Sequence, residues 1–217
     1  MGLLEVLKNK KVHYLYHANT VVTAITFLEN NGLYSRQAVE DKGLFQTPQV
    51  SDETDKFFGV YNDIFFDSCD IHARASKVNS YGPVLFVYHV DLLSNYLAHV
   101  AITKSNPLYW KAATTENEKY FQNIEEIMQD FNYGTFAQHI TIRNIGYIGF
   151  SFLSKIIFDS YEVEKLNQRQ YNIWKNAYNK LNILCSEKNI EFGLRNCFSC
   201  CQCHENFNEE HFLTGSD

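Results

Sequence analysis

The feature that most constrains the fold is a strand-like segment near the N-terminus that runs directly into a helix-like one. Side chains alternate along residues 11–17, KVHYLYH, which predicts a strand with His17 at its end. Asn19 or Thr20 can then cap a helix. Apolar residues at helical spacing give this helix a buried face, at Val21, Ala24, Ile25 and Leu28. Gly32 is expected to end the helix in the left-handed conformation, so strand, turn, helix and glycine stop form one unit.

Beyond this unit, the sequence indicates short strands separated by few and irregular helices. Apolar or alternating runs predict further strands, at residues 83–90, 99–103, 139–144 and 154–159. Helical spacing predicts one helix over 118–131 and a long one over about 161–187, opened by a capping box of Asp159 with Glu162. We therefore expect an α+β fold, in which a mixed or split antiparallel sheet is flanked by helices.

Composition places the chain among globular proteins. Of the 217 residues, 45% are hydrophobic and 20% charged, which is enough apolar material for a sizeable core. We expect one domain over 1–160, on which the long helix and a Cys/His-rich tail of residues 161–217 pack. The formal net charge of -6 disfavours broad phosphate-backbone binding, so a nucleic-acid partner would need a local basic cleft. Without a membrane-length apolar stretch or a signal-peptide pattern, we expect no membrane partner and a cytoplasmic location.

His17 stands where a strand ends and a helix begins. A helix N-terminus offers free N–H groups and the positive end of the helix dipole, which suits phosphate or pyrophosphate. A neutral imidazole beside it can hydrogen-bond a ribose hydroxyl. A core or capping role would also explain a histidine at this position, so the local pattern alone leaves both interpretations open.

Two longer segments carry a family resemblance. The first segment is VHYLYHANTVVTAITFLENNGLYSR, residues 12–36. It contains a His-containing turn, then a helix, and ends in a Gly-Leu-x-Ser-Arg-type motif. YNDIFFDSCDIHARASKVNSYGPVLFVYHV, residues 61–90, joins an aromatic segment, an arginine and a central strand. In this order they resemble the opening of the DarT-like ADP-ribosyltransferases. The resemblance covers about the first 90 residues and implies a fold of that type with NAD as substrate.

The resemblance also implies roles for particular residues. His17 and Asn19 or Thr20 would contact the adenosine side of NAD. An aromatic ring should stack on nicotinamide, for which the candidates are Tyr61, Phe65 and Phe66. A cation should hold the diphosphate, for which the candidates are Arg36 and Arg74.

The acid that such transferases carry, a glutamate at the start of a late strand, has no counterpart at the matching place. Gln138 and His139 stand there, before ITIRN. Three alternatives follow: a nearby acid serves, from among Glu118, Glu125 and Glu126; His139 acts as general base; or the protein binds nucleotide without catalysis. We take His139 and Arg74 as the candidate catalytic residues.

The function implied by the resemblance is an NAD-dependent ADP-ribosyltransferase that modifies a nucleic acid, of toxin or antiphage-defence type, with an antitoxin or other protein as a possible partner. RNA and single-stranded DNA are the candidate acceptors. The segment KSNPLYWK, residues 104–111, offers charge and stacking surface for bases, at Lys104, Tyr109, Trp110 and Lys111. The same aromatics would also suit a loop that they anchor to the core.

Two further interpretations come from other residues. Asp67, Asp70 and His72 are spaced densely enough to bind a divalent ion, which would suit a metal-dependent nuclease or hydrolase. A solvated turn in which the acids pair with Arg74 explains them equally. The third interpretation is a catalytically degenerate nucleotide- or nucleic-acid-binding module with a structural zinc tail.

That tail contains the run CFSCCQCH, with four of the six cysteines. Two overlapping C-x2-C spacings suit zinc, held by Cys197, Cys200, Cys203 and either His204 or His211. Free or redox-active thiols and an incomplete site shared with a partner are the alternatives.

Overall fold

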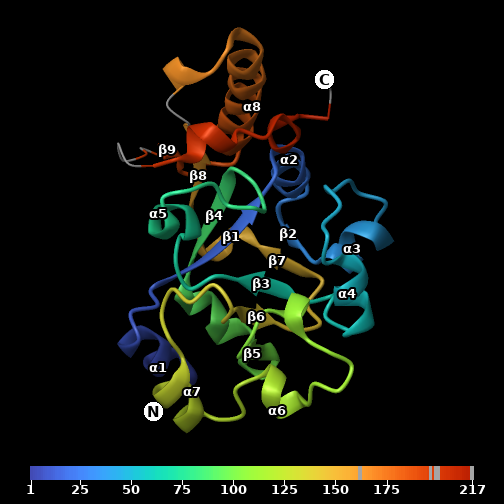
Figure 1. Ribbon diagram of the computed structural model, residues 1–217, viewed down its shortest axis with the longest axis vertical. Helices are drawn as coiled ribbons and strands as arrows, with labels where there is room; N and C mark the ends of the chain where they lie inside the picture. Colours follow the sequence, from blue (N-terminus) through green and yellow to red (C-terminus); the bar gives the residue numbers. More distant parts are fainter. Residues whose placement is uncertain (161–162, 196, 198–200, 216–217) are drawn as a thin grey trace.

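The structure is a computed structural model that describes residues 1–160, 163–195, 197 and 201–215, without the side chain of His204 (Figure 1). Its largest sheet has the order β1-β4-β8-β9, formed by Tyr14–Asn19, Val84–His89, Leu153–Asp159 and Phe192–Arg195. The β1–β4 and β4–β8 pairs are antiparallel, and β8–β9 is parallel. Five of the six β4 residues are buried, which confirms the central strand expected over 83–90.

Two smaller sheets complete the split arrangement. One has the order β3-β6-β5, formed by Ile64–Phe66, Ile140–Ile142 and Val100–Ile102, and the other pairs β2 (Gly32–Tyr34) with β7 (Tyr147–Gly149), all antiparallel. Tyr16 of β1 exchanges two backbone hydrogen bonds with Asp67, just after β3, at 3.0 and 2.9 Å. This bridge holds the end of β3 beside β1. The α+β fold with a mixed, split sheet and flanking helices is confirmed.

The helices lie around these sheets, with α8 (Gln168–Glu187) at one end of the long axis and α1 (Leu3–Asn9) at the other (Figure 1). Thr20 caps α2 (Val21–Glu29), which confirms the predicted helix start. The α8 helix contacts α2, and its buried residues are Trp174, Ala177, Leu181, Leu184 and Cys185. The remaining α-helices are short: α3 (Arg36–Asp41), α4 (Asp52–Phe57), α5 (Ile71–Ala75), α6 (Glu116–Lys119) and α7 (Ile124–Asp130).

The helix expected over 118–131 is wrong as a single element. The helix is interrupted between α6 and α7. In this segment Tyr120 forms an isolated β-bridge with Thr103, and the Phe121 N–H donates to the Ile102 carbonyl. Pairing with the end of β5 therefore replaces helical hydrogen bonds here, and Asn123 caps α7 afresh.

The long helix begins later than predicted. Asn167 and Gln170 form its capping box, while Glu162 lies outside the described residues. Asp159 is no helix cap: it is 2% exposed, and its carboxylate contacts His72 and Arg195.

The predicted left-handed Gly32 is also wrong. Asn31 adopts the positive φ, 62°, while Gly32 begins β2. A glycine is needed because a Cβ there would lie 2.3 Å from the Tyr147 ring and 2.6 Å from the Ile148 carbonyl oxygen. Among the described residues, no helix is both long and apolar enough to cross a membrane.

Candidate functional site

A cleft opens where β1 meets α2, bordered by the ends of β3 and β6 and by the segments around α3 and α4. It brings together eight of the residues singled out above from the sequence: His17, Asn19, Arg36, Tyr61, Phe65, Phe66, Asp67 and His139. They come from segments far apart in the chain, so only the fold makes them neighbours.

His17 is held in one orientation. Its Nδ1 lies 2.7 Å from the Phe65 carbonyl oxygen, which can only accept, so Nδ1 carries the proton. Burial lowers the pKa of His17, and its hydrogen bond to Phe65 opposes that shift only in part. The ring is therefore neutral near pH 7, and Nε2 remains as an acceptor on a residue that lines the cleft.

Asn19, the last residue of β1, is 5% exposed and lines the cleft. Within the described part of the chain, its amide Nδ2 has no hydrogen-bond partner. A buried donor without an acceptor costs about 1–3 kcal/mol. Such a donor in a cleft wall is explained when a ligand supplies the acceptor.

Arg36 is the one lysine or arginine among the described residues that line the cleft. Its guanidinium donates hydrogen bonds to Asp52 at 2.7 Å and to the Thr47 carbonyl at 3.0 Å, and its Nε also lies 2.5 Å from the second Asp52 oxygen in an ion pair. This bidentate pair fixes the planar group and offsets much of its charge. Any bound anion therefore meets a positioned but partly neutralised cation.

Two aromatic rings form part of the wall. The Tyr61 hydroxyl donates to Glu40 at 2.6 Å, and the Lys56 ammonium lies 4.6 Å from the Tyr61 ring centroid. Phe65 meets His139 edge to face, with ring centroids 6.1 Å apart. Phe65 is less constrained by polar partners and is the better platform for a flat ligand.

The polar end of the cleft is built around His139, which precedes β6. Its Nδ1 lies 3.2 Å from Asp67, and its Nε2 lies 3.2 Å from the Asn106 amide nitrogen. Nδ1 therefore donates to the carboxylate while Nε2 accepts from the amide. Sequence reasoning singled out His139 and Asp67 separately and missed their pairing, because 72 positions, 139 minus 67, separate them.

Two more carboxylates face the cleft. Burial raises the pKa of Asp55 to about 6, with a further rise from Asp52 and an opposing hydrogen bond from Ser51. Burial also raises the pKa of Asp63, against contacts with the Asn144 N–H and Arg143. Sequence reasoning placed neither of these two acids in the cleft.

Comparison with known proteins bears on the fold. No protein-family model matches the sequence, and no curated protein matches it. The structure of Thermus sp. 2.9 DarT in complex with ADP-ribosylated ssDNA is similar, with a TM-score of 0.50 at 10% identity over 85% of this chain and 95% of that one. The fold is DarT-like. DarT structures from the same source with NAD+ and with carba-NAD+ give TM-scores of 0.48 and 0.47 at 10% identity, over 85% of this chain and 96% of those chains.

Two expected NAD contacts do not line the cleft. The Thr20 hydroxyl bonds Thr23 and Thr47, at 3.0 and 2.7 Å, so it supports the wall from behind. Arg74 is exposed on α5 and lies over the Phe136 ring, 5.8 Å from its centroid. Of the two cations expected for the diphosphate, the structure brings Arg36 to the cleft and leaves Arg74 outside.

The alternative acids are also elsewhere. Glu118 is used in the capping box of α6, Glu125 is exposed, and Glu126 pairs with Lys104 at 3.1 Å. In the 104–111 loop, Trp110 is buried as an anchor, whereas Tyr109 is 72% exposed.

The divalent-ion site expected from Asp67, Asp70 and His72 is not formed. Asp67 faces His139, and Asp70 pairs with Arg195. His72 directs Nδ1 to Asp159 at 2.8 Å and Nε2 to Cys201 at 3.3 Å. Both ring nitrogens therefore point away from the two acids, which argues against the metal-dependent nuclease.

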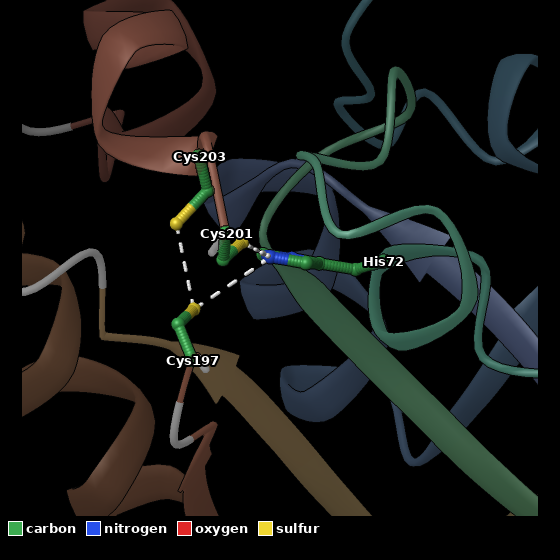
Figure 2. Close-up of side chains that lie close together, drawn as sticks. All are labelled: His72, Cys197, Cys201 and Cys203. Carbon is green, nitrogen blue, oxygen red and sulfur yellow. Dashed lines mark hydrogen bonds between the residues drawn. The ribbon is translucent and has the colours of Figure 1, made fainter. Parts of the chain in front are cut away.

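His72 instead joins the cysteines of the tail (Figure 2). Among the described residues, one group could hold a metal ion: His72, Cys197, Cys201 and Cys203. The sequence-predicted ligands Cys197 and Cys203 are both in it. Cys200 and the side chain of His204 lie outside the described residues. Sequence reasoning missed His72 as their partner because it lies 125 positions before Cys197, 197 minus 72.

Proposed function

We propose that the cleft binds NAD and that the protein transfers ADP-ribose from NAD to a nucleic acid. The observation that carries this proposal is the neutral His17, which lines the cleft, is fixed through Nδ1 and keeps Nε2 as an acceptor. The DarT-like fold supports it, since the similar Thermus structure was determined with ADP-ribosylated ssDNA.

In this proposal the adenosine half of NAD lies against the end of β1. His17 Nε2 accepts a hydrogen bond from a ribose hydroxyl, and the unpaired Asn19 amide donates to a ligand acceptor. The diphosphate lies near the N-terminus of α2 and Arg36, where the helix dipole adds to a partly neutralised guanidinium. Phe65 stacks on nicotinamide.

The Asp67–His139 pair takes the place of the missing late-strand glutamate. When the ribose–nicotinamide C–N bond breaks, nicotinamide leaves with the bonding electrons and positive charge develops on the sugar. A carboxylate in a partly buried cleft stabilises that charge. Asp67 then accepts the proton that the acceptor loses as it bonds to the sugar carbon. His139, itself held by Asn106, keeps Asp67 in place.

The proposed acceptor is a single-stranded nucleic acid, DNA or RNA. The cleft lining includes Tyr81, Asn106 and Pro107, and Tyr109 stands exposed on the 104–111 loop that carries the last two. Such a surface suits an unstacked base better than a duplex. A cytoplasmic toxin or antiphage-defence enzyme, with an antitoxin as partner, is the setting that this chemistry would fit.

The proposal is tested by incubating the purified protein with NAD labelled in the adenosine half, together with single-stranded DNA, RNA or protein. Label should pass to one nucleic-acid pool as nicotinamide is released. His17→Ala should reduce both signals about 10- to 100-fold through lost positioning. His13→Ala removes an exposed histidine before the same strand and should change neither. Transfer that survives His17→Ala unchanged would reject the site.

A binding module without catalysis is the second candidate, because no glutamate lines the cleft among the described residues. In that case NAD would bind in a His17-dependent way, as measured by calorimetry, and no nicotinamide would appear with any acceptor.

A further inference from the structure

We propose that His72, Cys197, Cys201 and Cys203 bind one Zn²⁺ ion in a closed tetrahedral site that fastens the C-terminal tail to the body of the protein. This inference does not depend on the function proposed for the cleft. It rests on the geometry of four side chains that the fold brings together (Figure 2).

The distances between the four ligand atoms suit a single ion. His72 Nε2 lies 3.3 Å from Cys201 Sγ and 3.7 Å from Cys197 Sγ, and the Cys197 and Cys203 sulfurs are 3.4 Å apart. All four atoms lie within 4.8 Å of one another. A tetrahedron with Zn–N of about 2.0–2.1 Å and Zn–S of about 2.3 Å has N–S and S–S edges of about 3.6 and 3.8 Å. The three separations given above differ from these edges by a few tenths of an ångström, and no pair exceeds them by more than about 1.2 Å.

The donor set and its burial indicate a structural rather than a catalytic ion. Cys201, Cys203 and His72 are buried, and Cys197 is partly buried. Three thiolates and one imidazole fill all four positions that Zn²⁺ prefers, which leaves none for water or substrate. Soft sulfur ligands with one imidazole also disfavour Mg²⁺ and Ca²⁺.

His72 is oriented as a zinc ligand by a carboxylate behind it. Asp159, 2% exposed, accepts from His72 Nδ1 at 2.8 Å, so the lone pair of Nε2 faces the sulfurs. Arg195 bonds the other oxygen of Asp159 at 2.5 Å and also pairs with Asp70, the N-cap of α5. The carboxylate is thus itself held in place, in the carboxylate–histidine–metal arrangement that tunes such sites.

The ligands join parts of the chain that are distant in sequence. His72 lies on α5, and the cysteines follow β9, the last strand of the main sheet. The Gln202 N–H also donates to the Ser76 carbonyl at 3.0 Å, so the backbone docks at the same place. Because α5 follows the segment that carries Asp67, the ion would anchor one wall of the cleft as well as the tail.

Metal content provides the first test. Protein purified without chelator should contain one zinc per chain by elemental analysis, and Co²⁺ in its place should give the thiolate charge-transfer absorption of a tetrahedral three-sulfur site. Cys201→Ser should lose the ion, whereas Cys69→Ala, which removes a buried cysteine outside the cluster, should keep it.

Two variants make the ligand assignment specific. Cys200→Ser should retain one zinc, since Cys201 and not Cys200 is the ligand proposed here. His72→Ala should lose the ion, and His72→Cys should restore it as a four-cysteine site, which separates loss of a ligand from failure to fold.

Three results would overturn the proposal. They are absence of stoichiometric metal in the unmodified protein, zinc retention in folded Cys201→Ser, and a Cys197–Cys203 disulfide in protein prepared under reducing conditions, where the 3.4 Å sulfur separation would close to about 2.05 Å.

Discussion

The cleft and the cysteine cluster each contain a histidine that is fixed through Nδ1. The two histidines differ in what surrounds the other ring nitrogen, Nε2. Both His17 and His72 are fixed through Nδ1, one by the Phe65 carbonyl and the other by the Asp159 carboxylate. His17 lines the cleft, whereas the Nε2 of His72 faces sulfurs in the interior.

The difference shows that the surroundings of the free nitrogen, and not the residue type, indicate the role. A cleft that offers a neutral imidazole and an unpaired amide donor suits an exchangeable organic ligand. A closed site with four inward-facing donors suits an ion that stays. Changes at the first should therefore alter turnover, and changes at the second should alter stability.

The largest effect is expected at the cleft. Asp67→Asn keeps the shape of the side chain but removes its charge and its ability to take a proton, so nicotinamide release should fall about 10²- to 10⁴-fold. The thermal midpoint and zinc content should be nearly unchanged, because the amide oxygen of the isosteric asparagine can still accept the hydrogen bond from His139. Full turnover in this variant would show that another group, Asp55 foremost, is the acid.

Removal of the metal ion should instead lower the stability of the protein. If free Zn²⁺ is present at about 1,000 times the dissociation constant of the site, binding adds about 4 kcal/mol to the free energy of unfolding. A strong chelator removes this contribution. For a chain of this size that lowers the thermal midpoint by about 8–16 °C. Calorimetry with and without added Zn²⁺ measures it. An unchanged midpoint would mean that the cluster contributes no metal-linked stability.

Asp159→Asn tests whether the cluster depends on its supporting carboxylate. The change removes charge-assisted bonds to His72 and Arg195 and should cost about 2–3 kcal/mol of unfolding free energy. Zinc affinity, measured by competition with a chelating dye, should fall about 10- to 100-fold. The matched control is Asp91→Asn, which breaks a surface pair with Lys8 and should cost no more than about 1 kcal/mol.

The smallest effect concerns pH. Because burial raises the pKa of Asp55 to about 6, the folded protein binds a proton there that the unfolded chain releases near pH 4. The stabilising contribution is complete below pH 4 and is lost as pH rises through 6. Asp55→Asn should therefore stabilise the protein by about 1–2 kcal/mol at pH 7 and hardly at pH 4, as measured by urea unfolding.

Glu53→Gln is the control on the same helix, because Glu53 is 92% exposed in its side chain and should show no such pH dependence. Equal effects of Asp55→Asn at both pH values would show that Asp55 titrates normally.

Local sequence patterns predicted the elements that depend on neighbours along the chain. Strand β1, the Thr20 cap and α2 form from alternation, a capping hydroxyl and apolar spacing within a few residues. The same rules failed at Tyr120, where pairing with the end of β5 replaced helical hydrogen bonds, and at Asp159, where burial with Arg195 replaced a cap.

Neighbouring residues were enough to predict β1, α2 and the central strand β4, and to single out the His17 turn and the thiol cluster. The tertiary structure alone decided that Asp67 meets His139, that Arg74 lies outside the cleft and that His72 turns to the cysteines. The two kinds of feature depend on interactions that act over different distances along the chain. Propensity and capping act over one or two turns of chain, whereas a binding cleft or a metal site is made by side chains whose approach depends on how sheets and helices pack.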